Sequence, residues 1–169
     1  MKVFCLKSPS FQLLVISFAL CLQVPSGEAQ TDVPKIVGTW KLNLAKSKYD
    51  PGPPPRSHFQ TWTWDGENLT HSTSGVNAKG EQSNGAHWAA KFDGKDYPVF
   101  GSGSGNDSIR LLKRIDAYTS EAVATKDGKE MLTYRHVVSS DGKTLTLTVK
   151  STSGRAQRRN DVMVLEKQY

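Results

Sequence analysis

The sequence reads TLTLTVK at residues 144–150, where each threonine is followed by an aliphatic side chain. Strict alternation over such a run is typical of a β-strand with one apolar and one polar face. The pair Asp141-Gly142 comes just before it, and residues 131–138 before this pair also have a strand pattern. Because Asp-Gly favours the positive backbone angles of tight turns, we predict an antiparallel hairpin.

The same turn signal recurs along the chain. Further Asp-Gly pairs stand at 65–66, 93–94 and 127–128, and no long amphipathic run indicates a helix. The prolines at 51–55 predict a stiff connecting loop, because proline fits neither a helix interior nor a central strand. The segments predicted as strands are 36–44, 57–64, 68–73, 85–92, 95–100, 109–115, 119–125, 131–138, 144–150 and 160–167.

About ten short strands in succession must protect their edges, either by closing on themselves or by forming a sandwich. Mostly short connections favour an up-and-down meander, because Greek keys need long crossovers. We therefore predict an all-β, antiparallel up-and-down meander that closes into a barrel. The glycine-serine stretch 101–108 is predicted to be a flexible loop, either at the barrel mouth or a connector without a role.

The first residues differ from the rest and predict a secretory signal peptide. Lys2 and Lys7 precede an apolar run over 11–24, and Gly27-Glu28-Ala29 supplies small residues for cleavage after Ala29. The run is short for a transmembrane helix, which needs about 20 residues. We predict residues 1–29 as the signal peptide, residues 30–169 as one barrel domain, and export to the periplasm or the medium.

Removal of the leader changes what can hold the domain together. Cys5 and Cys21 both lie in the leader, so residues 30–169 contain no cysteine and no disulfide. The formal net charge is +6, but the basic residues are scattered apart from Arg155, Arg158 and Arg159. Nucleic-acid binding needs a basic stripe with stacking aromatics, and this pattern lacks one. We expect a monomer that is not integral to a membrane after cleavage.

Both ends of the predicted domain resemble known barrel families. Residues 38–42, GTWKL, are similar to the Gly-x-Trp signature that opens lipocalins and to the opening of the fatty-acid-binding proteins. Residues 162–167, VMVLEK, resemble the closing strand of the latter. The chain also resembles a group of secreted bacterial proteins described as lipocalin-like. The resemblance implies a calycin barrel.

The resemblance also implies a structural role for Gly38 and Trp40. In lipocalins the signature tryptophan closes the barrel floor and stacks near a basic residue of a late strand. Applied to Trp40, this role leaves Arg158, Arg159 and Lys167 as candidate cationic partners.

Two departures from the fatty-acid-binding proteins limit what the resemblance implies. Those proteins place a helical lid after the first strand, and the prolines at 51–55 exclude one here. They also hold the carboxylate with an Arg-x-Tyr on the last strand, where this chain has Met163 and Leu165. A fatty-acid ligand therefore does not follow from the resemblance.

Aromatic side chains form the candidate ligand site. Trp62 and Trp64 share one strand face, and Trp88 and Phe92 share a face of a later strand. Turned inward, such faces would either fill the core or line a cavity for an apolar ligand, since both uses need the same residues. The candidate lining residues are Trp62, Trp64, Trp88, Phe92, Tyr134 and His136.

The sequence contains four histidines, of which His58 shares a face with Trp62 and Trp64, and His136 shares one with Tyr134. No pair has the short spacing of a metal site, so we predict no metal and no cofactor. No nucleophile elbow or zinc-protease motif is present, and we predict no enzymatic activity. The predicted function is binding of an apolar or amphipathic small molecule inside the barrel. The alternative is an envelope interaction or structural protein with a solid barrel.

Overall fold

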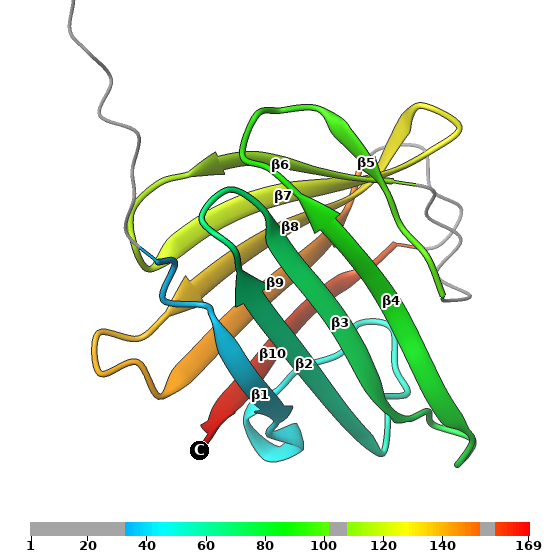
Figure 1. Cartoon of the computed structure of the whole chain (residues 1–169). Coiled ribbons are helices and arrows are strands. Elements are labelled where there is room, and N and C mark those ends of the chain that lie inside the picture. Colours follow the sequence, from blue (N-terminus) through cyan, green and yellow to red (C-terminus); the bar gives the residue numbers. More distant parts are fainter. Residues whose placement is uncertain (1–32, 102–107, 153–157) are drawn as a thin grey trace, which may run out of the picture. The chain divides into compact units, whose positions relative to one another are not determined.

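The computed structural model describes residues 33–101, 108–152 and 158–169, and the predicted signal peptide lies outside these residues. Within them, ten strands form one antiparallel sheet in the order β4-β3-β2-β1-β10-β9-β8-β7-β6-β5 (Figure 1). This confirms the predicted up-and-down meander. The elements are β1 (Gly38–Leu42), the 3-10 helix η1 (Leu44–Lys46), β2 (Ser57–Trp64), β3 (Leu69–Val76), β4 (Gln82–Ala90), β5 (Asp96–Pro98), β6 (Ser108–Arg114), β7 (Thr119–Lys126), β8 (Lys129–Val138), β9 (Thr144–Ser151) and β10 (Asn160–Gln168).

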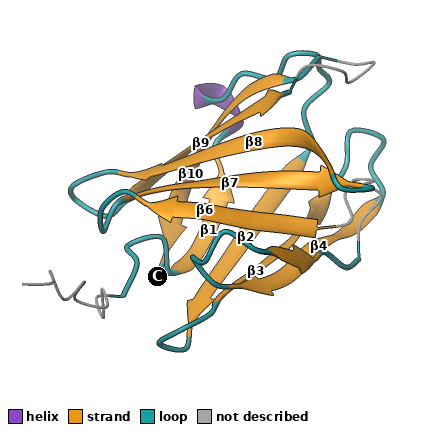
Figure 2. Ribbon diagram, turned by 90° about the horizontal axis from the view of Figure 1, so that it is seen from above, coloured by secondary structure: helices purple, strands orange, loops and turns teal. Residues whose placement is uncertain are grey.

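The sheet curls into a nearly closed barrel (Figure 2). Its first and last strands are neighbours, with Trp40 paired to Lys167 and Leu42 paired to Leu165. The two edges of the sheet, β4 and the segment that continues β5, meet at one antiparallel bridge. There the amides of His87 and Phe100 donate to each other's carbonyl oxygens over 2.9 and 3.0 Å. We refer to this bridge, the one that the described residues form between the two edges, as the seam.

Three of the four Asp-Gly turns join strands that pair with each other, at 65–66, 127–128 and 141–142. The pair at 93–94 lies between β4 and β5, the two edges of the sheet, and in the described residues the segments on either side of it are joined by the seam and by no longer ladder. Antiparallel neighbours are therefore present on either side of 93–94, as predicted, but no ladder supports this turn among the described residues. The Asp93 carboxylate instead accepts hydrogen bonds from the Lys95 amide and the Tyr97 hydroxyl, and these hold the connection locally.

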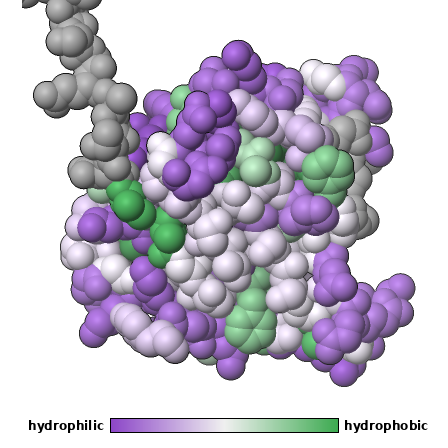
Figure 3. All heavy atoms as spheres, in the orientation of Figure 1, coloured by the Kyte–Doolittle hydropathy of each residue, from purple (hydrophilic) through white to green (hydrophobic). Residues whose placement is uncertain are grey.

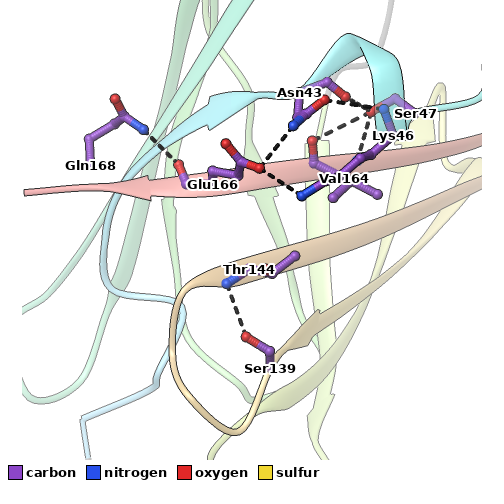
Figure 4. A network of polar contacts seen from close by, with 8 residues as sticks. All are labelled: Asn43, Lys46, Ser47, Ser139, Thr144, Val164, Glu166 and Gln168. Atoms are coloured by element: carbon purple, nitrogen blue, oxygen red, sulfur yellow. Dashed lines mark hydrogen bonds and ion pairs between the residues drawn. The ribbon is translucent and has the colours of Figure 1, made fainter.

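The first strand is shorter than predicted because η1 follows it. Asn43 caps η1 by accepting a hydrogen bond from the Lys46 amide, and its amide group donates to Glu166 on β10 over 2.8 Å. Lys46 also binds the Glu166 carboxylate, at 3.0 Å (Figure 4). Leu44, which the sequence places in the strand predicted over 36–44, consequently lies in η1 and is 41% exposed.

The core lies inside the barrel, and Trp40 is wholly buried in it. Its indole N–H donates to the Ile36 carbonyl over 2.7 Å. The Lys167 ammonium lies 5.2 Å from the centroid of the Trp40 ring, so Lys167 is the cationic partner among the three candidates. The segment around Ile36 is tied to the β6–β7 connection by a hydrogen bond from the Lys35 amide to Ala117. These contacts cover the end of the barrel where β1 begins, which we call the closed end.

The other end of the barrel is less covered. Here β1 ends and β2 begins, and the proline loop over 51–55 lies between them without regular structure, as predicted. The outer face in Figure 3 is mostly polar or intermediate in hydropathy, with separate apolar side chains rather than one broad patch. Nothing on that face competes with the interior as a site for an apolar ligand.

Candidate functional site

The barrel interior contains a cavity of about 170 Å³. It lies between the closed end and the opposite end of the barrel, which we call the mouth. Its wall is formed by inward-facing side chains of strands from around the barrel. The side chains from β6, β7 and β9 are small or aliphatic, whereas β2, β3 and β4 contribute aromatic rings. Its lining residues include His58, Trp62, His71, Trp88, His136 and Arg159.

The aromatic part of the wall follows directly from strand register. His71 on β3 is paired with Trp62 on β2 and with Trp88 on β4. The ring centroids lie 4.1 Å apart for Trp62 and His71, and 5.1 Å apart for His71 and Trp88. His136 on β8 approaches Trp62 edge to face, with the centroids 5.2 Å apart. We refer to Trp62, His71, Trp88 and His136 as the aromatic cluster.

A chain of polar groups runs along the inner face of β2 toward the mouth. The Trp62 indole N–H donates to the Gln60 side-chain oxygen over 3.3 Å. The Gln60 amide nitrogen lies 3.2 Å from Nε2 of His58. Since an amide nitrogen can only donate, that ring nitrogen of His58 accepts, and His58 carries its proton on Nδ1. Both polar atoms of the Gln60 side chain therefore have hydrogen-bond partners, although Gln60 is buried.

His71 differs from the other inward-facing histidines. It is buried, and neither of its ring nitrogens has a hydrogen-bond partner among the described residues. His136 places Nδ1 3.4 Å from the Ser120 hydroxyl. A buried polar group without a partner is costly, by about 1–3 kcal/mol, and such groups gather where function requires them.

Burial keeps all three interior histidines neutral. It lowers the pKa of His136 to about 4, although a hydrogen bond with the Ser120 backbone acts in the opposite direction. Burial also lowers the pKa of His58 to about 4, and the nearby Arg159 cation lowers it further. The pKa of His71 falls well below its usual 6.5 through burial and through the neighbouring His136 and His58. At neutral pH the inner wall is therefore uncharged around the aromatic cluster.

Arg159 lies where the cavity opens at the mouth. It lines the interior cavity, a wider outer cavity of about 530 Å³, and a third against the proline loop. The interior and outer cavities share His58, Thr73, Ala86 and Arg159 in their walls, so the interior communicates with the surface there. Of the described residues that line these two cavities, Arg159 alone carries a full charge at neutral pH.

A buried carboxylate fixes the Arg159 side chain. Asp161 is 1% exposed; one of its oxygens accepts from Nε of Arg159 and the other from the Asp50 amide. Tyr49 lies close by with its hydroxyl buried, and burial together with the Asp161 charge raises its pKa to about 12. Asp161 lines neither the interior cavity nor the outer one, so the charge that faces both is positive.

The structure places four of the six residues predicted from the sequence in the cavity wall: Trp62, Trp88, Tyr134 and His136. Trp64 and Phe92 instead pack, partly buried, against the core. Trp64 ends β2 and pairs with Leu69 near the closed end, beyond the cavity. Sequence reasoning missed His71 and Arg159 as wall residues. His71 had a usable signal, because it stands two residues after Leu69 on the same strand face.

The fold and the site define a nearly closed, ten-stranded antiparallel barrel with an interior cavity, an architecture consistent with a calycin-like barrel. No protein-family model matches the chain, and no curated protein matches it either. Among residues 33–101, 108–152 and 158–169, no helix is long and apolar enough to cross a membrane. The same residues contain no group of three or more His, Cys, Asp or Glu placed to hold a metal ion.

Proposed function

We propose that this protein is an exported, lipocalin-like barrel that binds a compact amphipathic small molecule in its interior. The observation that carries the proposal is the interior cavity, which has the aromatic cluster in its wall and opens at Arg159. Concave, mainly apolar sites with a few fixed polar groups are the usual form of small-molecule sites in proteins.

The size of the cavity limits the ligand. Drug-sized ligands occupy pockets of about 300–1,000 Å³, whereas an engineered apolar cavity of about 150 Å³ binds benzene. The interior cavity, at about 170 Å³, therefore suits one ring or a similarly compact apolar group. Any further part of the ligand would lie in the outer cavity.

The proposal is tested by titrating the protein with the neutral fluorophore N-phenyl-1-naphthylamine while tryptophan emission is recorded. Its phenyl ring has the size of the interior cavity, and its naphthyl group would lie in the outer cavity. We expect saturable binding with quenching, because Trp62 and Trp88 line the cavity. Ala122→Phe places a ring in the cavity from β7 and should abolish binding. Ala89→Phe is the matched control, since Ala89 is exposed on β4. Equal binding by the two folded variants would overturn the proposal. So would failure of the native protein to bind this fluorophore together with the single-ring ligands phenylacetate and 2-phenylethanol.

The alternative of a solid barrel that acts through its surface requires a filled interior, and the cavity argues against it. The glycine-serine stretch 101–108 and the basic segment 154–159 are the surface segments that such a protein would use, and both lie partly outside the described residues. No observation in the described part of the chain favours a surface partner over an interior ligand.

Export is supported by the leader-like pattern of residues 1–29. It is tested by the intact mass of the protein recovered from the periplasm or the medium of an expressing bacterium. We expect a chain that begins at Gln30. Recovery of the full-length chain from the cytoplasm alone would contradict export and leave the binding proposal standing.

A further inference from the structure

We propose that the ligand is a compact aromatic carboxylate, with its ring in the interior cavity and its carboxylate on Arg159. This inference rests on the proposed binding function and names the ligand class for the same site. It follows from three features of the site: an uncharged aromatic interior, a cavity the size of one ring, and one cation where the cavity opens.

The interior favours a ring over a flexible chain. The rings of Trp62 and Trp88 meet edge to face with centroids 5.6 Å apart, and His136 presents another ring to Trp62. Aromatic pairs prefer such offset and edge-to-face geometries, each worth more than area burial alone. A cavity of about 170 Å³ accommodates a planar ring among these faces but not the length of a fatty acyl chain.

The charge at the mouth favours an anion. Aspartate and glutamate are absent from the described residues that line the interior and outer cavities. Among the described lining residues, Arg159 contributes the one full positive charge to both. A ligand with a cationic group would therefore place like charges together, while a carboxylate would gain a charge-assisted pair in a partly desolvated place.

The pairing with Asp161 leaves Arg159 able to bind a ligand. A guanidinium group has five N–H donors in a rigid fork, and Asp161 accepts from the Nε edge. The second oxygen of Asp161 accepts from the Asp50 amide, so this carboxylate is held in place away from the cavity. The Nη groups of such a fixed guanidinium are suited to paired hydrogen bonds with a ligand carboxylate.

The test compares two ligands of the same size, phenylacetate and 2-phenylethanol, by calorimetric titration of the mature protein. We expect phenylacetate to bind at least about tenfold more tightly, as a charge-assisted hydrogen bond predicts. Arg159→Gln should remove this preference by weakening phenylacetate binding and leaving 2-phenylethanol binding within about twofold. Arg158→Gln is the matched control. It removes the same charge one residue away, where the side chain lines neither the interior nor the outer cavity, and it should preserve the preference.

Arg159→Gln leaves the buried Asp161 without its cation and could fail to fold. The double variant Arg159→Gln/Asp161→Asn removes both charges, and it too should bind phenylacetate no more tightly than 2-phenylethanol. The relative affinity of the native protein for the two ligands tests the inference without any variant. Equal affinities of the native protein for the two ligands, or loss of the preference in Arg158→Gln, would overturn the inference while the proposed function stands. Failure of both ligands and of the neutral fluorophore to bind would overturn the proposed function itself.

Discussion

Trp62 and Trp88 meet edge to face with ring centroids 5.6 Å apart, although β3 separates their strands in the sheet. The contact is possible because His71, which is paired with both residues, is the inward-facing residue between them. A histidine is smaller than a tryptophan, so the two larger rings can reach past it. His71 is thus both the buried residue whose ring nitrogens lack hydrogen-bond partners among the described residues and the residue whose size shapes this part of the cavity wall.

Replacing His71 by phenylalanine should stabilise the fold. The variant keeps a ring between Trp62 and Trp88 and removes two buried nitrogens that lack partners among the described residues. We expect the free energy of unfolding at pH 7, from urea denaturation, to rise by about 1 kcal/mol. The exposed His87 supplies the control, because His87→Phe should change it by less than about 0.5 kcal/mol. A loss of stability in His71→Phe would show that His71 is satisfied in the native protein.

Stability should decline steeply in mild acid. A histidine with a lowered pKa takes up its proton more readily in the unfolded chain, so stability is complete above pH 6.5 and falls as the pH drops toward 4. One pKa unit corresponds to about 1.4 kcal/mol, and the shift of His136 to about 4 is thus worth roughly 3 kcal/mol. Urea midpoints measured between pH 7 and 4.5 test this.

The acid effect can be assigned to the interior histidines. Asp65 and Glu166 have lowered pKa values because they accept hydrogen bonds, so the stability they add is lost at lower pH than that of the histidines. His136→Phe should flatten the slope between pH 6.5 and 4.5, whereas His87→Phe should not. An equal slope in the native protein and in His136→Phe would contradict the assignment.

Gly85 on β4 should not tolerate a side chain. A Cβ at this position would lie 1.8 Å from the Thr73 hydroxyl oxygen on β3, next to the register shift between Ser72 and Ser74. We expect Gly85→Ala to lower the free energy of unfolding by about 1–3 kcal/mol, as overpacking does. Thr73→Ala removes the clashing oxygen, so the double variant should recover most of the loss. Additive effects of the two substitutions would contradict this account.

The seam should open more readily than any strand ladder. One bridge joins the edges there, and Phe100 is 55% exposed. We expect the amides of His87 and Phe100 to exchange with deuterium much faster than those of β9, because local opening breaks few bonds. Gly101→Ala should raise the rate further, since its Cβ would lie 2.8 Å from Nδ1 of His87.

Gly94→Ala is the control for the seam. Gly94 shares the positive φ of Gly101, but a Cβ there meets nothing within 4 Å. It should therefore leave exchange at His87 unchanged. Equal protection of the seam and of β9 in the native protein would show that the edges are joined more firmly than the bridge indicates.

The strands were predictable because their signals are local. The alternation over 144–150 and the Asp-Gly pairs depend on a few neighbouring residues, and β2 and β9 lie where the pattern placed them. The Asp-Gly pair at 93–94 does lie between antiparallel neighbours, but turn chemistry does not reveal how many residue pairs the joined segments form. Whether the two edges of the sheet meet at the seam depends on the curvature of the whole sheet.

The candidate site was only partly predictable for a related reason. Trp62 and Trp64 share a strand face, but the depth of each along the barrel depends on strand tilt and stagger, which no short window contains. Arg159 looked like one member of a basic loop. Its position over the cavity depends on Asp161 two residues later, whose buried carboxylate binds it and the Asp50 amide.

The strand order has a consequence for how this domain acquires its structure. The middle of the chain, β4 and β5, supplies the two edges of the sheet. Its first and last strands, β1 and β10, are neighbours inside the sheet, with β2 to β4 beyond β1 and β5 to β9 beyond β10. Each half of the meander can assemble from sequence neighbours, but their union depends on pairs such as Thr39 with Gln168, which lie far apart along the chain. Contacts of long sequence separation form slowly. We expect the sheet of β1 to β4 and the sheet of β5 to β10 to form first. The barrel would be completed only when β1 pairs with β10.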